Sequence, residues 1–242
     1  MSGVALGYVH HNEVAYSWHR SVAELVARGG VDLEIPVRCG TGQITEARNE
    51  GASAFLDSGC EWLLWTDTDM GFAPDTLERL LAVDRPVVGG LTFAAVEYLD
   101  DDMGGHRIRA EPVLFKWAAD DTGFVRWPDY PRDQLVQVAG TGGALILVHR
   151  SAYEHLEQTC GRRWYDQRRI QATGRVISED LAFCARLGEA GIPIFVHTGV
   201  KSTHMKAAWI GEADYDRKGA SRAVRDPARP KAAAAKGRRR KR

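Results

Sequence analysis

The fold is decided by the stretch Glu61-Trp62-Leu63-Leu64-Trp65-Thr66-Asp67-Thr68-Asp69-Met70-Gly71-Phe72. An apolar run of strand length ends in two carboxylates one residue apart, and Pro74-Asp75 then signals the start of a helix. Ligands of an open α/β sheet sit outside the carboxyl ends of its strands, so we expect Asp67 and Asp69 at a metal or substrate site. Because residues i and i+2 of an extended strand project to the same side, the two carboxylates are predicted to reach one cation together.

Strand and helix patterns alternate on both sides of this stretch. Strands are predicted at 4–9, 32–38 and 86–91, and helices at 21–27, at 44–56 and from 74 onward. This alternation predicts an α/β domain with a mainly parallel twisted sheet flanked by helices, and the patterns at 111–118 and 123–127 add a small antiparallel hairpin. No G-x-G-x-x-G motif follows the first strand, so the dinucleotide-binding fingerprint is absent.

Two glycine-containing stretches interrupt the pattern. Residues 96–109 are polar and glycine-rich and are predicted to form a mobile, solvated loop that could close over a substrate. Residues 135–148 form an apolar strand pattern broken by Gly140, Gly142 and Gly143. No Lys-Ser/Thr pair follows them, which excludes a P-loop, and a kinked strand that lets a ligand approach its backbone fits better.

The composition indicates one α/β domain. The chain has 242 residues, of which 44% are hydrophobic, enough to bury a full core. The start lacks a secretory signal pattern, and no apolar run is long enough to span a bilayer, so a cytoplasmic protein is expected, in the host cytoplasm if a phage encodes it. The four cysteines form no C-x-x-C pair, which argues against a zinc knuckle and a disulfide scaffold.

The formal net charge of zero hides a strong asymmetry. Residues 217–242 carry twelve Lys and Arg against one acid, Asp226, which leaves 20 basic and 31 acidic side chains in residues 1–216. The body is therefore at about −11 and the tail at about +11. Such a tail cannot bury apolar area, and we expect a domain at 1–210 followed by a basic, disordered tail at 211–242.

Arg48 occurs on the apolar face of the helix predicted at 44–56. A guanidinium that points inward needs an anionic partner, because an unpaired buried charge costs several kcal/mol. Two interpretations are open. Either the stem of Arg48 packs at the rim with its head in water, or Arg48 and its neighbour Asn49 reach the phosphates or base of a nucleotide.

A second acidic pair opens a later helix. Ser178 is predicted to cap a helix whose first residues are Glu179 and Asp180. For an arbitrary helix, such acids are best explained as partners of the helix dipole. The strand pattern at 194–197 then leads to His204, and a lone histidine is usually structural or on the surface. The order in which these residues and the earlier motifs follow one another along the chain favours a functional role for them instead.

Five features follow one another between residues 4 and 205. They are Arg48-Asn49, Asp67-Thr68-Asp69, the glycines of 140–143, Ser178-Glu179-Asp180 with Ala190-Gly191 after it, and His204. This ordered set resembles the GT-A-fold glycosyltransferases of the family-2-like kind, especially the small versions encoded by bacteriophages. The resemblance implies a nucleotide-diphospho-sugar transferase fold and a metal-dependent transfer of a sugar to an acceptor hydroxyl.

The resemblance also assigns the metal and the base. Asp67 and Asp69 would bind Mn²⁺ or Mg²⁺ together with the nucleotide-sugar, and His204 would be a further metal ligand. Oxygen ligands with one imidazole suit Mn²⁺ at least as well as Mg²⁺. Asp180 or Glu179 would be the general base, with Asp180 favoured, and would take the proton of the acceptor hydroxyl in an inverting reaction.

The implied donor site contains Arg48, Asn49, Asp67, Gly142 and Gly143. A UDP-sugar is the first choice of donor. Two departures from the family leave the base and the sugar open: no acid ends the second strand, and His10-His11-Asn12 replaces the usual Thr/Tyr-Asn signature. The acceptor is also open, and a virion protein and a modified DNA base are both candidates.

Two other functions compete with this hypothesis. The first is a nucleic-acid-binding protein that uses the cationic tail, which the acidic body does not favour. The same tail could instead bring the enzyme to a nucleic-acid acceptor. The second is a different nucleotide-using transferase on a similar sheet, which the absence of a glycine-rich cofactor loop disfavours.

Overall fold

The computed structural model describes residues 3–40, 43–99 and 106–207 of the chain. The basic tail predicted at 211–242 lies outside these residues, so the predicted domain boundary stays a prediction. The chain divides into two compact units, one formed by Met1–Val96 with Arg109–Lys206 and the other by Glu97–Ile108 with Ala207–Arg242. The first unit contains the central sheet and all the predicted site residues.

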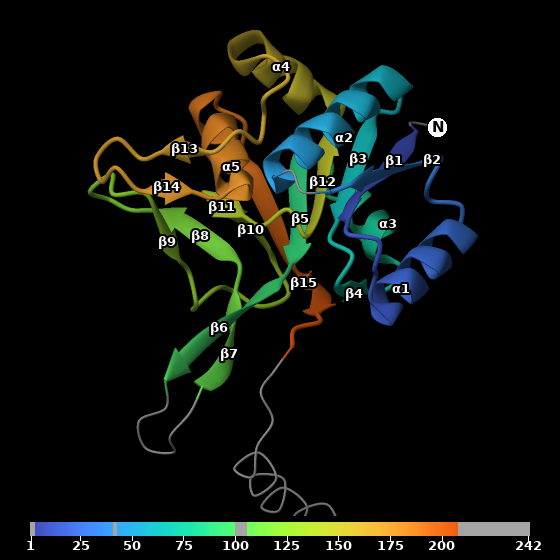
Figure 1. Ribbon diagram of the computed structural model, residues 1–242, viewed down its shortest axis with the longest axis horizontal. Helices are drawn as coiled ribbons and strands as arrows, with labels where there is room; N and C mark the ends of the chain where they lie inside the picture. Colours follow the sequence, from blue (N-terminus) through green and yellow to red (C-terminus); the bar gives the residue numbers. More distant parts are fainter. Residues whose placement is uncertain (1–2, 41–42, 100–105, 208–242) are drawn as a thin grey trace, which may run out of the picture. The chain divides into compact units, whose positions relative to one another are not determined.

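An eight-stranded sheet forms the centre of this unit (Figure 1). Its strand order is β10-β15-β5-β12-β3-β1-β2, and the short strand β4 pairs with β15 off this path. The strands are β1 (Val4–His10), β2 (Leu33–Arg38), β3 (Trp62–Thr66), β4 (Met70–Phe72), β5 (Val87–Leu91), β10 (Leu135–Val138), β12 (Leu145–His149) and β15 (Ile194–His204).

Five strands of the sheet run in one direction. β1 pairs in parallel with β2 and β3, and β5 pairs in parallel with β15. β12 lies between β3 and β5 and is antiparallel to both, so β1, β2 and β3 run in the same direction as β5 and β15. β10 is antiparallel to β15. The predicted mainly parallel sheet is therefore confirmed, with β12, β10 and the short β4 as the reversed strands.

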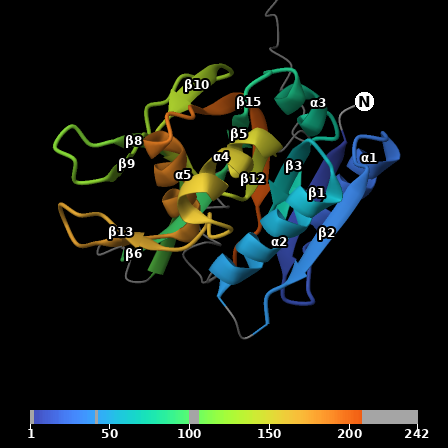
Figure 2. The ribbon, with the colours of Figure 1, turned by 90° about the horizontal axis from the view of Figure 1, so that it is seen from above.

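Helices cover both faces of the sheet (Figure 2). They are α1 (Tyr16–Ala27), α2 (Ile44–Ser58), α3 (Thr76–Leu81), α4 (Arg150–Cys160) and α5 (Glu179–Glu189). Alternate residues of β3 point to opposite faces: Leu63 and Trp65 pack in the cluster that includes α2, α4 and α5, whereas Leu64 packs with α1 and α3. Because both faces are covered, the run of β3 is continuously apolar, which is the pattern that predicts a buried strand.

Three smaller sheets lie outside the central one. β8 (Leu114–Trp117) pairs with β9 (Phe124–Arg126) as the predicted hairpin, and β11 (Gly140–Thr141) joins them through β8. β13 (Arg168–Arg169) pairs with β14 (Val176–Ile177), and β6 (Phe93–Leu99) with β7 (His106–Pro112). The α/β architecture implied by the family resemblance, a helix-flanked sheet with antiparallel hairpins, is thus present.

Two local predictions are wrong, and a third strand is correctly placed but longer than predicted. The sequence predicts a loop at 96–109, but its described residues belong to the paired strands β6 and β7. Val96, Tyr98 and Ile108 alternate with polar residues as in a strand, and the polar composition of the segment obscured this alternation. The kinked strand expected at 135–148 is three strands, since β11 leaves for the β8–β9 sheet between β10 and β12. The strand expected at 194–197 continues to His204 as β15.

In the part of the chain that the structure describes, no helix has the length and apolar composition needed to cross a membrane.

Candidate active site

Asp67 and Asp69 lie in the turn that joins β3 to β4. The backbone N–H of Asp67 donates to the carbonyl O of Ala144 at 3.1 Å, and the N–H of Met70 donates to the carbonyl O of Asp67 at 3.2 Å, which closes the turn. The expectation that both aspartates sit on one extended strand is therefore wrong. Because the chain turns here, their two carboxylates have different partners.

Asp67 forms an ion pair with a buried arginine. Nη2 of Arg48 donates to Oδ1 of Asp67 at 2.7 Å, and the side chain of Arg48 is only 1% exposed. Nη1 donates to the carbonyl O of Gly143 at 3.3 Å, and the guanidinium lies over the ring of Trp65, 4.8 Å from its centroid. The interpretation that Arg48 sits at the rim with its head in water is therefore wrong.

The charge of Arg48 is held by carboxylates on two elements. Burial disfavours the charged guanidinium, but the nearby carboxylates of Asp67 and Asp180 outweigh that effect and raise the pKa of Arg48 above its ordinary value. Arg48 is thus a permanently charged group inside the protein, between the β3–β4 turn and the start of α5.

Asp69 has two partners of its own, an imidazole and an ammonium group. Its Oδ2 lies 3.0 Å from Nε2 of His204 and accepts a hydrogen bond from Nζ of Lys206 at 2.6 Å. The antiparallel pairing of β4 with β15 places them there, since His204 stands opposite Met70 and the N–H of Met205 donates to the carbonyl O of Asp69 at 2.8 Å. The structure thus brings together two of the three predicted metal ligands.

Protonation at this pair follows from the contacts. Burial raises the pKa of Asp69, but the hydrogen bonds from His204 and Lys206 outweigh it and lower that pKa to about 2. The hydrogen bond to Asp69 raises the pKa of His204, although burial opposes this. Nδ1 of His204 lies 2.7 Å from the carbonyl O of Phe93, so Nδ1 is a donor and the ring presents Nε2 to Asp69.

The donor chemistry of these residues fits a divalent ion. Carboxylates with an imidazole suit Mn²⁺, and a backbone carbonyl that holds the other ring nitrogen is the usual support of a metal-binding histidine. Among the described residues, however, no three His, Cys, Asp or Glu side chains are gathered closely enough to hold an ion. Asp69 and His204 are in contact, while the carboxylate of Asp67 faces Arg48.

Gly142 and Gly143 form the loop between β11 and β12, and this loop passes between charged side chains. A Cβ atom on Gly143 would lie 2.6 Å from Oδ1 of Asp180 and 2.9 Å from Nη2 of Arg48. On Gly142 it would lie 3.7 Å from Oδ2 of Asp180 and 3.2 Å from Cγ1 of Val113. The backbone therefore approaches the two charges as closely as only glycine permits.

Asp180 and Glu179 occupy the first turn of α5, as predicted, and the hydroxyl of Ser178 caps the helix by accepting from the N–H of Leu181 at 3.5 Å. Oδ1 of Asp180 is buried and has no hydrogen bond of ordinary geometry from any described residue. Burial raises the pKa of Asp180, Arg48 partly offsets this, and burial together with Asp180 raises the pKa of Glu179. A carboxylate with a raised pKa and an unused oxygen is suited to general-base chemistry.

A cleft of about 520 Å³ opens beside Asp180. Its lining residues include Asp180 and Gly142, the basic residues Arg126 and Arg175, and apolar residues such as Phe124. Space for a ligand thus adjoins the carboxylate with the unused oxygen.

Asn49 has a different position from Arg48. Its Nδ2 donates to Oδ1 of Asp166 at 2.8 Å, and its Oδ1 accepts from the N–H of Tyr165 at 2.9 Å. The side chain of Asn49 therefore ties α2 to the segment that follows α4. Its predicted contact with the donor stays a prediction.

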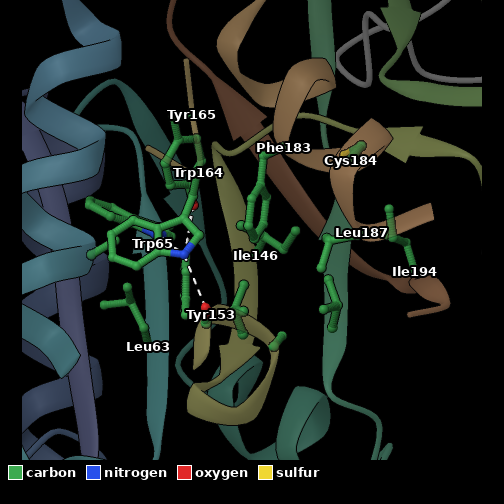
Figure 3. Packing of buried hydrophobic residues seen from close by; sticks show 14 of the residues in the cluster. Leu63, Trp65, Ile146, Tyr153, Trp164, Tyr165, Phe183, Cys184, Leu187 and Ile194 are labelled. Atoms are coloured by element: carbon green, nitrogen blue, oxygen red, sulfur yellow. Dashed lines mark hydrogen bonds between the residues drawn. The ribbon is translucent and has the colours of Figure 1, made fainter. Parts of the chain in front are cut away.

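Trp65, which lies under the guanidinium of Arg48, belongs to a buried aromatic cluster. Figure 3 shows this cluster. Nε1 of Trp65 donates to the hydroxyl of Tyr153 at 2.9 Å, and that hydroxyl lies 2.7 Å from the hydroxyl of Tyr165. Nε1 of Trp164 donates to the carbonyl O of Tyr153 at 3.0 Å, and burial raises the pKa of Tyr153 to about 12. No motif distinguishes Trp164 and Tyr165 in the sequence, and only their large apolar area among basic neighbours indicates burial.

Fold and site together define an α/β protein with carboxylates at the carboxyl end of a central strand and at the start of a later helix. No curated protein sequence and no protein-family model matches the chain. Among solved structures, the crystal structure of A197 from STIV is similar with a TM-score of 0.51 and 11% identity, over 85% of this chain and 86% of that one. That likeness shows a shared fold.

A second solved structure, 4-diphosphocytidyl-2C-methyl-D-erythritolsynthase from Anaerococcus prevotii DSM 20548, has a TM-score of 0.45 and 12% identity, over 92% of this chain and 99% of that one.

Proposed function

We propose that the chain is a metal-dependent glycosyltransferase that moves a sugar from a nucleotide-sugar, first of all a UDP-sugar, to an acceptor hydroxyl. The observation that carries the proposal is the contact between Asp69 and His204, 135 residues apart in the sequence, with Nε2 of the imidazole facing the carboxylate at 3.0 Å. The resemblance of the ordered motifs supports the same function.

The donor side is proposed to lie at the β3–β4 turn. Asp69 and His204, with Asp67, would hold Mn²⁺ or Mg²⁺, which when bound would stabilise the charge that develops on the leaving diphosphate. Arg48 places a fixed positive charge next to Asp67, and the backbone of Gly142 and Gly143 leaves room for a close approach.

The acceptor side is proposed to be the cleft beside Asp180. A carboxylate oxygen of Asp180 takes the proton of the acceptor hydroxyl while the hydroxyl oxygen bonds to the anomeric carbon. The bond from that carbon to the diphosphate oxygen breaks, and the configuration inverts. Arg48 favours the ionised form of Asp180, which is the form that accepts a proton. Glu179 is the second candidate for the base.

Ligand-induced stabilisation tests the proposal. UDP-, GDP-, TDP- and CMP-sugars are screened by thermal shift with and without Mn²⁺, because a ligand at a hundred times its Kd stabilises the native state by about 2.7 kcal/mol. We expect one nucleotide-sugar to stabilise the protein only when Mn²⁺ is present, and Asp69→Ala to lose this effect while Asp57→Ala, an exposed helix residue, keeps it. Stabilisation and full transfer activity in Asp69→Ala would exclude the proposed site.

The base is tested by two further variants. Asp180→Asn should bind the donor as the wild type does and lose transfer, whereas Glu179→Gln should retain transfer. The reverse result would move the base to Glu179.

A second candidate function rests on the charge of about +11 in residues 217–242. Phosphate neutralisation by this tail would give nucleic-acid binding that weakens steeply with salt. Deletion of 217–242 separates the two functions: an enzyme keeps donor turnover, and a pure binding module loses its activity. Loss of transfer to DNA alone, with donor turnover intact, would indicate a modified DNA base as acceptor, as opposed to a virion protein.

A further inference from the structure

We propose that Lys206 is an internal counter-ion that occupies the place of the divalent ion on Asp69 and thereby makes metal binding depend on diphosphate binding. The proposal rests on the proposed function. Its basis is one oxygen atom, Oδ2 of Asp69, which accepts from Nζ of Lys206 at 2.6 Å and faces Nε2 of His204 at 3.0 Å.

Backbone pairing places Lys206 next to Asp69. β15 ends at His204, and the N–H of Met205 donates to the carbonyl O of Asp69 at 2.8 Å. Lys206 is the next residue, so its side chain returns to the carboxylate of the same aspartate. Any cation that binds Asp69 therefore meets the ammonium of Lys206 directly.

A divalent ion and an ammonium cannot share this oxygen at contact distance, because like charges repel strongly at a few ångströms. One of them must leave. The side chain of Lys206 is 41% exposed, and exposed ion pairs are held weakly, so the flexible lysine stem is the part that moves. Its displacement reduces the affinity of the metal when the metal binds alone.

A diphosphate changes this balance. It brings negative charge to the site where the displaced ammonium has lost its carboxylate, so Lys206 gains a new anionic partner when the nucleotide binds. Metal and diphosphate then strengthen each other's binding, and by thermodynamic linkage the two effects are equal. Lys206 is in this sense a positioning and specificity residue for the donor complex, and no proton transfer is assigned to it.

The test compares Mn²⁺ affinity by titration calorimetry, with and without saturating UDP, in five proteins. They are the wild type, Lys206→Met, Lys206→Arg, Asp69→Asn and Lys201→Met. Lys201, which lies in β15, is the matched control. Its ammonium pairs with a different carboxylate, that of Asp133, at 2.7 Å. All titrations are made at one pH, and folding is checked by circular dichroism.

Lys206→Met is expected to bind Mn²⁺ alone roughly three- to tenfold more tightly than the wild type. UDP should increase the Mn²⁺ affinity of the wild type clearly and that of Lys206→Met less. Lys206→Arg, which keeps the charge, should behave more like the wild type, and Lys201→Met should be indistinguishable from it.

The possible failures are distinguishable. Equal Mn²⁺ affinity and equal UDP enhancement in Lys206→Met and the wild type would overturn the role of Lys206, while loss of Mn²⁺ binding in Asp69→Asn would still support the proposed metal site. Absence of Mn²⁺ binding by the wild type with UDP, or unchanged binding in Asp69→Asn, would overturn both.

Discussion

Gly143 and Asp180 lie so close together that a Cβ atom on Gly143 would be 2.6 Å from Oδ1 of Asp180. Non-bonded atoms do not approach so closely, and the same Cβ would be 2.9 Å from Nη2 of Arg48. The backbone of Gly143 therefore lies against both the carboxylate of Asp180 and the guanidinium of Arg48, with no room for a side chain. The charges of α2 and α5 can face one loop only because this position carries no side chain.

Gly143→Ala should displace Asp180 or Arg48. We expect a loss of stability of roughly 1–3 kcal/mol in urea unfolding, as for other overpacked sites, and a strong loss of transfer. Gly188→Ala is the matched control: its Cβ would meet nothing within 4 Å inside α5, so alanine should be neutral or stabilise by roughly 0.5–1 kcal/mol. Equal stabilities of the two variants would contradict the close contact.

Arg48→Met should be among the most destabilising single changes. It would leave Asp67 without its ion-pair partner and Asp180 without the charge that lowers its pKa. Because the buried carboxylate of Asp180 is left without a compensating charge, we expect a loss of about 3–5 kcal/mol, which chemical denaturation can measure. Arg28→Met removes the exposed pair with Glu78 and should leave stability unchanged. A similarly small effect at Arg48 would mean that Asp67 does not need its partner.

Asp180→Asn should stabilise the protein at neutral pH. Burial raises the pKa of this carboxyl in the folded state, so its favourable contribution is complete below its ordinary pKa and is lost as the pH rises through the raised value. Asparagine cannot ionise and avoids that loss. Thermal unfolding between pH 4 and pH 8 should therefore give curves that converge at low pH and separate as the pH rises, with the variant above. Parallel curves would refute the raised pKa.

Tyr153→Phe should weaken the aromatic cluster below Arg48. The change leaves Nε1 of Trp65 without its acceptor and removes the partner of the Tyr165 hydroxyl, and a buried donor left unpaired costs about 1–3 kcal/mol. Urea unfolding measures the difference. Tyr16→Phe, at a position that is 79% exposed, should have no effect, and a wild-type stability for Tyr153→Phe would show that water replaces the lost hydroxyl.

Much of the fold could be predicted because it depends on local pattern. The apolar run ending at Thr66 had the length of a strand, and the helical spacing of α2 placed Arg48 on the buried face with a need for an anion. Ser178 identified the start of α5 in the same way. Each of these inferences used neighbours within a few residues, where sequence spacing fixes geometry.

The remaining features depend on register between distant segments. That His204 meets Asp69 follows from the pairing of β15 with β4, and nothing in the strand pattern at 194–197 showed that β15 would continue so far. The contact of Lys206 with Asp69 was not predicted either, because it depends on the same pairing of β15 with β4. The spacing of two residues between His204 and Lys206 is nevertheless the one that places two side chains on the same face of an extended chain. Asn49 and Tyr165 meet across 116 residues, a pairing that no local spacing contains.

β15 is the last strand of the described chain, yet it occupies an interior place in the sheet, between β10 and β5. During translation the ribosome must therefore release residues up to 204 before the sheet can close. A nascent chain that stops before Ile194 leaves β5 with an open edge and also lacks the imidazole that faces Asp69. Closure of the sheet and formation of the Asp69–His204 contact are one event, so a prematurely terminated product would lack both.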